Sequence, residues 1–126
     1  MPRLLTVCAA VVLSSALAFY AAGPAQSEGR RQPNVVIIHH PGPNWKAGVP
    51  YGEQDGLQAH IEHYRKLFES GQLLMGGPFL DESGGMMVST EGASIDDLKA
   101  FAADDPAVKS GLLTADVKPW FVAMKK

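Results

Sequence analysis

The stretch GLQAHIEHYRKLFESGQLLMGGPF, residues 56–79, predicts a helix followed directly by a strand. A helix is expected over about residues 54–70, with an apolar stripe that recurs every three or four residues: Leu57, Ile61, Tyr64 and Phe68. Gly71 stands where helices commonly end in glycine. QLLMGGPF, residues 72–79, then predicts a strand that is interrupted by two glycines and stopped by Pro78.

A strand and a long loop precede this unit. NVVIIHH, residues 34–40, holds four consecutive β-branched residues, which is typical of a buried strand. PGPNWKAGVPYGE, residues 41–53, contains three prolines and three glycines, so an irregular loop is expected. Loops of this length within compact domains are often functional.

A third strand and a second helix follow the unit. MMVSTE, residues 86–91, predicts the strand. Ser94 is expected to cap the helix, with Asp97 three residues later in a pattern close to a capping box. The expected buried face of the helix comprises Ile95, Leu98, Phe101 and Ala102. Asp105-Pro106 should end the helix, because proline disfavours helical geometry at the preceding residue.

The chain closes with a turn through Gly111 and a strand over about residues 112–124, in which Pro119 indicates an edge position or a bulge. The order β-α-β-β-α-β predicts an α+β fold of the ferredoxin-like type, an antiparallel sheet with two helices on one face. The other face would be bare. Its apolar side chains need cover, so the sequence predicts a homodimer that packs through this sheet face.

The N-terminus indicates an exported protein. Arg3 precedes an apolar, small-residue run over residues 4–19, and residues 1–25 have the composition of a secretory signal peptide. The alternative is a retained membrane anchor, but the run is short for a span of about 20 residues. We therefore expect a periplasmic or secreted protein without a stable membrane span after cleavage. Residues 26–33 would be a flexible lead-in, and residues 34–126 the domain.

Composition excludes some functions of the mature chain. The one cysteine, Cys8, lies within the expected leader, so cleavage leaves no thiol nucleophile, disulfide or thiolate metal site. Loss of Arg3 leaves 10 basic against 13 acidic residues, a net charge of −3 that gives nucleic-acid binding no support. No motif indicates a cofactor.

Two of the four histidines lie on the first helix. At about 100° per residue, His60 points along the seam between helix and sheet, whereas His63 lies near the solvent border. From periodicity alone, His60 is more simply interpreted as a partly buried structural histidine, with a functional role as the alternative, and His63 is expected to be a solvated neighbour. His39 and His40 face opposite sides of a strand, and no carboxylate stands at a fixed spacing, so no metal site is predicted.

Asp105 is the second candidate. A carboxylate at a helix C-terminus is unfavourable because the dipole is negative there, and the adjacent Asp104 makes this worse. An imidazolium could stabilise one of them, and a carboxylate in turn raises the basicity of a neighbouring imidazole.

These residues fall into a known pattern. HIEHYRKLFESGQLLMGGPF, GGMMV, FAADDPAVKSGLL and VKPWF occur in the order and spacing of the YciI-like (YCII-related) family, which the chain resembles over about residues 34–124. The resemblance implies a dimeric α/β barrel fold and a His-Asp pair in a cleft, which falls on His60 and Asp105. It also implies that some relatives are dehydrochlorinases or lyase-like enzymes on ring compounds. The leader departs from the common pattern.

Two functions fit these observations. One is a lyase-, dehydrochlorinase- or isomerase-like enzyme with His60 as general acid or base and Asp105 as its partner. Its pocket for a small organic molecule is expected to include His40, Trp45, Tyr64, Met75, Gly77 and Pro78. The alternative is a non-catalytic ligand-binding or stress-related module of the cell envelope.

Overall fold

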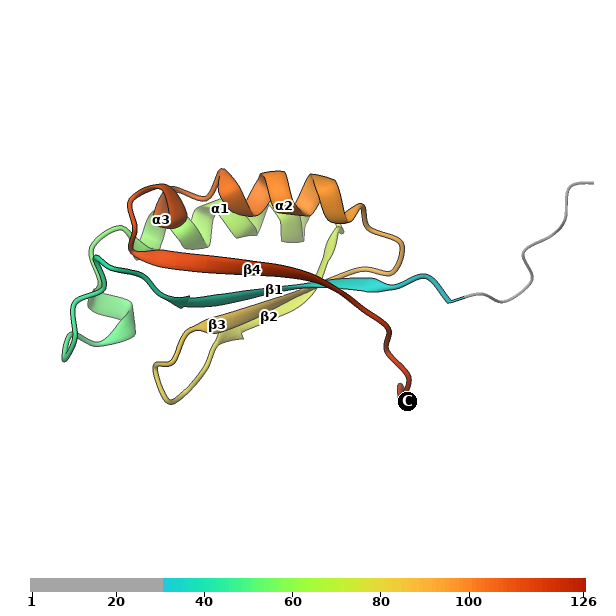
Figure 1. Cartoon of the computed structure of the whole chain (residues 1–126), viewed down its shortest axis with the longest axis horizontal. Helices are drawn as coiled ribbons and strands as arrows, with labels where there is room; N and C mark the ends of the chain where they lie inside the picture. The colour runs from blue at the N-terminus through green and yellow to red at the C-terminus, as the bar shows by residue number, and fades with distance from the viewer. Residues whose placement is uncertain (1–30) are drawn as a thin grey trace, which may run out of the picture.

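A computed structural model describes residues 31–126 of the chain (Figure 1). The expected signal peptide, residues 1–25, lies outside the described residues, as does most of the expected lead-in. Within residues 31–126, no helix combines the length and apolar character needed to cross a membrane.

Four strands and three α-helices make up the domain. The strands are β1 (Asn34–Pro41), β2 (Leu73–Pro78), β3 (Gly85–Ser89) and β4 (Leu113–Trp120). The α-helices are α1 (Leu57–Glu69), α2 (Ile95–Ala103) and α3 (Pro106–Lys109), and a short 3₁₀ helix, η1, spans Tyr51–Glu53. The sheet order is β2-β3-β1-β4 with every pair antiparallel. This arrangement confirms the predicted α+β, ferredoxin-like fold, which is consistent with the expected dimeric α/β barrel type.

The α-helices lie on one face of the sheet (Figure 1). Alternation along β1 turns Val35, Ile37 and His39 toward them, and Val36 and Ile38 toward the other face. The main core joins the helix-facing side of the sheet to α1 and α2 through Val35, Ile37, Tyr64, Leu67, Leu73, Leu98 and Ala102. Among the described residues, no helix covers the opposite face.

Helix α1 buries a face different from the expected one. Its buried residues are Leu57, His60, Tyr64 and Leu67, whereas Ile61 and Phe68 are 37% and 59% exposed. The expected apolar stripe and the buried face share Leu57 and Tyr64, and the stripe placed His60 to one side, along the seam between helix and sheet. The histidine is in fact at the centre of the buried face, which decides where its ring points.

The boundaries of several elements differ from the sequence predictions. Helix α1 begins at Leu57 rather than near residue 54, and β4 ends at Trp120 rather than near residue 124. Pro119 lies in β4, an outer strand of the sheet, which confirms the predicted edge position. Helix α3 was not predicted.

The loop over residues 41–53 is well braced. The side chain of Gln54, 4% exposed, donates to the carbonyl oxygens of Lys46 and Val49 at 2.7 and 2.9 Å, and accepts from Lys46 N at 3.1 Å. Gln54, which was predicted to begin the first helix, therefore belongs to the loop and stabilises it. This bracing holds Tyr51, which lines a pocket together with residues of α1 and β2.

Candidate active site

His60 and Asp105 are in direct contact beneath α1. His60 Nδ1 lies 2.6 Å from Asp105 Oδ2, a distance typical of a charge-assisted hydrogen bond. Both side chains are buried, with 2% and 0% exposed. Because an ionised carboxylate can only accept, Nδ1–H of His60 is the donor. Its other ring nitrogen, Nε2, has no hydrogen-bond partner among the described residues and remains for a ligand.

Asp105 is held by the first turn of α3. It is the N-cap residue of this helix, and its Oδ1 accepts from Ala107 N at 2.9 Å. Asp105 is thus in a position where carboxylates are favoured, which corrects the expectation of an unfavourable carboxylate at a helix C-terminus. Helix α2 ends instead at Asp104, whose carboxylate pairs with Lys109. The Asp105-Pro106 sequence could have predicted the start of α3, because proline is common at the first position of a helix and aspartate at the N-cap.

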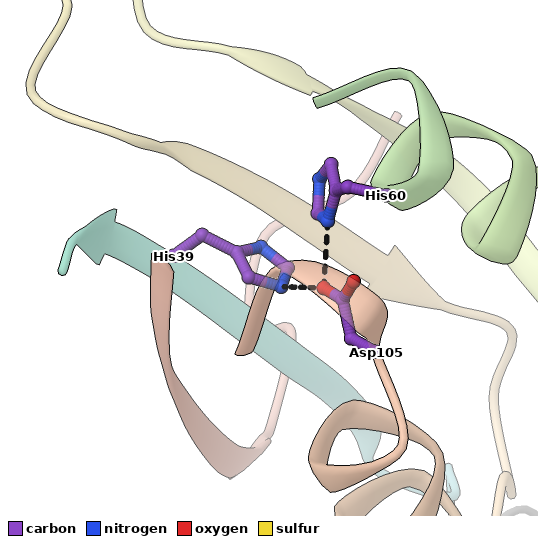
Figure 2. A group of neighbouring side chains, drawn as sticks. All are labelled: His39, His60 and Asp105. Carbon is purple, nitrogen blue, oxygen red and sulfur yellow. Dashed lines mark hydrogen bonds and ion pairs between the residues drawn. The ribbon is translucent and has the colours of Figure 1, made fainter. Parts of the chain in front are cut away.

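His39 is the third member of the cluster, and sequence reasoning did not select it. Its ring is 2% exposed, and its Nε2 lies 3.9 Å from Asp105 Oδ2 and 3.1 Å from the Tyr64 hydroxyl. Figure 2 shows the rings of His39 and His60 directed at the same carboxylate. The two rings meet edge to face with centroids 4.8 Å apart. Alternation from Val35 and Ile37 would have placed His39 on the helix side.

His40, which was predicted to contact substrate, lies on the opposite face of the sheet. Its side chain is 51% exposed, and its Nε2 is 3.8 Å from Asp116 Oδ2. The register explains this, because His40 pairs with Thr114 one residue beyond the His39–Ala115 pair. The structure therefore does not bring His40 to the cluster, and the neighbouring His39 faces the helices instead.

The environment sets the charges of the cluster. Burial would raise the pKa of Asp105, but the hydrogen bonds from His60 and Ala107 and the charges of His60 and His39 outweigh burial and lower it. Burial, with the charge of His60, lowers the pKa of His39 from 6.5 to about 4, so this ring is neutral near pH 7. Burial and the charge of Asp105 raise the pKa of Tyr64, whose phenol stays protonated.

An apolar pocket of about 490 Å³ opens beside the cluster, between α1 and β2. Its volume is in the range of small-molecule sites. His60, Tyr64, Tyr51 and Arg65 are the polar residues of the lining, and the remaining wall is mainly apolar: Ile61, Phe68, Leu73, Leu74, Met75 and Met87. The predicted residues Tyr64, Met75 and Gly77 thus line the same pocket as His60. At Gly77 an added Cβ would have no atom within 4 Å, so a ligand can approach the backbone there.

Two predicted pocket residues lie elsewhere. Trp45 packs with Tyr51, ring centroids 5.9 Å apart, against a second small core of Leu57, Ala107, Leu112 and Leu113. Pro78 ends β2 opposite Gly85. Neither lines the pocket. Trp45 instead supports Tyr51, which does.

His63 is not the solvated neighbour expected from the sequence. Its ring stacks on Phe101 with centroids 4.0 Å apart, and its Nε2 lies 2.8 Å from the Phe101 carbonyl oxygen. The ring therefore bridges α1 and α2 and is half-buried. The prediction was wrong because it considered α1 alone, and α2 covers the side of α1 on which His63 lies.

His39, His60 and Asp105 are also the kinds of residue that bind metals, and their candidate ligand atoms lie within 4.8 Å of one another. Two atoms that ligate one zinc ion at about 2.0–2.1 Å in tetrahedral geometry are roughly 3.3 Å apart. The 2.6 Å between His60 Nδ1 and Asp105 Oδ2 is shorter. This arrangement fits a shared proton better than a shared metal ion.

Comparisons with known proteins bear on the fold and the family of the chain. No curated protein matches the chain. Among solved structures, the chain is similar to 5-chloro-2-hydroxyhydroquinone dehydrochlorinase (TftG) from Burkholderia phenoliruptrix AC1100, in complex with 2,5-dihydroxybenzoquinone. The sequences are 23% identical, the TM-score is 0.50, and the match covers 69% of this chain and 93% of that one. This likeness supports the fold.

The profile of the YCII-related domain matches residues 34–121, from the first residue of β1 to the residue after β4. The match includes His39, His60 and Asp105 together with every strand and helix of the domain. The chain therefore belongs to the YCII-related domain family.

Proposed function

We propose that the protein catalyses proton transfer on a small organic molecule, with elimination or isomerisation as the outcome. The observation that carries this proposal is the buried His60–Asp105 contact beside an apolar pocket that His60 lines. Asp105 directs Nδ1 of the ring inward and stabilises an imidazolium, and Nε2 is left to exchange a proton with a ligand. The mainly apolar wall favours a ligand with few charges.

The proton-transfer step balances without a cofactor. His60 Nε2 takes a proton from carbon, and the C–H electron pair moves into the substrate. In an elimination that pair forms a double bond, and the leaving group departs from the adjacent carbon with its own pair. In an isomerisation His60 returns the proton at another carbon. The dehydrochlorinase to which the chain is similar suggests chloride as the first leaving group to test.

The direct test is chloride release from 5-chloro-2-hydroxyhydroquinone and related chlorinated ring compounds. His60→Gln removes the base but keeps a side chain that can donate to Asp105. We expect its rate to fall about 10²–10⁴-fold, the usual contribution of a positioned acid or base. His63→Gln is the matched control, because His63 lies on the same helix and contacts Phe101 rather than Asp105. Its rate should stay close to that of the parent.

The alternative is a ligand-binding module of the cell envelope without catalysis. It is favoured by the apolar character of the pocket wall, which would hold a ligand whether or not a reaction follows. Isothermal titration with the same compounds distinguishes the two. Tight binding without turnover in the parent protein, with affinity lost in His60→Gln, would replace the enzymatic proposal with the binding one.

Export and dimerisation belong to the same proposal. The composition of residues 1–25 supports secretion, and the sheet face without helices supports a homodimer. N-terminal sequencing of the protein recovered from fractionated cells tests the first. A mature N-terminus before about residue 20 in the membrane fraction would favour an anchor, since a leader is removed near its small residues.

A further inference from the structure

One buried group is not used by the proton transfer described above. Nδ1 of His39 is the one buried side-chain nitrogen or oxygen without a hydrogen-bond partner among residues 31–126. The other nitrogen of this ring, Nε2, faces two groups, the Tyr64 hydroxyl at 3.1 Å and Asp105 Oδ2 at 3.9 Å. The ring is therefore oriented, and the position of its proton has a consequence for Tyr64.

The His39 ring carries one proton. Burial and the charge of His60 lower its pKa to about 4, so near pH 7 the ring is neutral and only one nitrogen bears hydrogen. A buried N–H without an acceptor is among the least tolerated groups in folded proteins, whereas an acceptor without a donor is tolerated better. The neighbouring carboxylate also favours an N–H dipole at Nε2. Both effects place the proton on Nε2.

This tautomer fixes what the Tyr64 hydroxyl does. If Nε2–H of His39 donates, the hydroxyl oxygen of Tyr64 accepts, and the phenolic proton has no acceptor among the described residues. Tyr64 lines the pocket, so this proton can be satisfied by solvent or a ligand there, whereas a proton on the buried Nδ1 of His39 could not. Tyr64 lines the pocket together with His60, and the two residues are 3% and 2% exposed. Their ring centroids are 5.0 Å apart. A single ligand in this pocket could therefore accept a hydrogen bond from the Tyr64 hydroxyl and exchange a proton with His60 Nε2.

We propose that Tyr64 is the hydrogen-bond donor of the site, positioned by His39, and that it binds the oxygen of a carbonyl or phenol while His60 exchanges a proton with a nearby atom of the same ligand. This inference rests on the proposed function for its catalytic meaning. As His60 breaks the C–H bond, the electron pair moves onto the carbonyl oxygen, and the Tyr64 O–H stabilises the resulting enolate. The ligand class is an apolar ring or chain with an enolisable carbonyl or an acidic phenol.

The first test is the position of the His39 proton. Nitrogen-15 chemical shifts of the imidazole rings distinguish the two tautomers in the mature protein near neutral pH. We expect His39 to be protonated on Nε2 and not on Nδ1. A purely structural role for His39 would not require this signature. Protonation on Nδ1 would overturn the proposal, because Tyr64 would then donate to His39 and not to a ligand.

The second test uses 4-nitrophenol, whose absorbance reports both binding and ionisation. Tyr64→Phe keeps the aromatic ring and removes the donor, and we expect the affinity for the phenolate to fall about ten-fold or more, as for the loss of a hydrogen bond to a charged group. His63→Gln is the control, because His63 lies next to Tyr64 on α1 but does not line the pocket. Unchanged affinity in Tyr64→Phe, or no binding by the parent protein, would overturn the proposal.

The outcomes separate this inference from the proposed function. If His60→Gln abolishes chloride release but Tyr64→Phe binds the phenolate as the parent does, proton transfer stands and the donor assignment fails. If no compound is turned over but Tyr64→Phe weakens phenolate binding, the donor assignment stands as part of a binding site and catalysis fails.

Discussion

At the scale of single residues, the site depends on which nitrogen of each histidine is engaged. His60 uses Nδ1 for Asp105 and keeps Nε2 for the pocket, whereas His39 turns Nε2 toward Asp105 and Tyr64. The other carboxylate oxygen of Asp105, Oδ1, accepts a hydrogen bond from Ala107 N. One carboxylate thereby orders two rings that lie on different elements.

The burial of His39 predicts a pH-dependent stability. The unfolded chain binds a proton at His39 as the pH falls through 6.5, but the folded protein binds it only near 4. Between these values acid favours the unfolded chain, so the free energy of unfolding should fall with falling pH. The shift corresponds to ~3 kcal/mol at about 1.4 kcal/mol per pKa unit. The pKa of Asp105 is lowered in the folded protein, so its contribution to the free energy of unfolding is lost only as the pH falls below its ordinary pKa of 3.8.

Urea denaturation at about pH 7 and pH 4.5 measures this effect. In His39→Gln the decrease in unfolding free energy across this range should be smaller than in the parent. His40→Gln, which changes the exposed neighbour on the other sheet face, should retain the full decrease. An equal decrease in His39→Gln and in the parent would show that His39 is not the group responsible.

At the scale of elements, the backbone near β3 positions His39. Gly84 has φ +135°, and an added Cβ would lie 1.8 Å from the His39 carbonyl oxygen. Only glycine allows this conformation and this approach. The end of β1 that carries His39 is therefore held against the start of β3, where Gly85 pairs with His39.

We expect Gly84→Ala to destabilise the fold by about 1–3 kcal/mol or more, since strain and a backbone clash coincide. Gly52→Ala is the matched control, because its Cβ would have no atom within 4 Å and its φ is not positive. Thermal unfolding of the two variants measures the difference. Equal melting temperatures would mean that the β1–β3 junction can relax at little cost.

Much of the element pattern could be predicted from the sequence, and the exceptions have physical causes. The strands, both long helices and the edge position of β4 follow from local apolar patterns and proline, which depend on neighbours in sequence. Helix α3, the burial of His63 under Phe101 and the place of His39 depend on contacts between distant elements. His60 and Asp105 were identified because a family pattern already links them, while no local pattern links either to His39.

At the scale of the whole molecule, the sheet face without helices exposes apolar side chains. Val36 and Val88 pair across β1 and β3, as do Ile38 and Met86. Together with Lys118, Pro119 and Trp120, part of this face lines a second pocket of about 350 Å³ that has a mainly apolar wall. Trp120 is 44% exposed. A second copy of the chain would cover these groups.

A charge on this face should therefore weaken the proposed homodimer. We expect Ile38→Glu to shift the protein toward a monomer in light scattering coupled to size-exclusion chromatography, because the charge would have to be buried in the interface. Ile61→Glu is the control, since Ile61 lies on α1 at the pocket and away from this face. A parent protein that is monomeric at all concentrations, or an unchanged mass for Ile38→Glu, would contradict the expectation.

The central claim is that Asp105 and His60 share a hydrogen bond that directs Nε2 of His60 to the pocket. Proton NMR of the mature protein tests it most directly, because a short N–H···O⁻ bond moves the bonded proton to low field. We predict a low-field resonance on His60 Nδ1 that disappears in Asp105→Asn, while the signals of His63 stay in place. Its absence from the parent protein, or its persistence in Asp105→Asn, would contradict the pairing and the chemistry proposed from it.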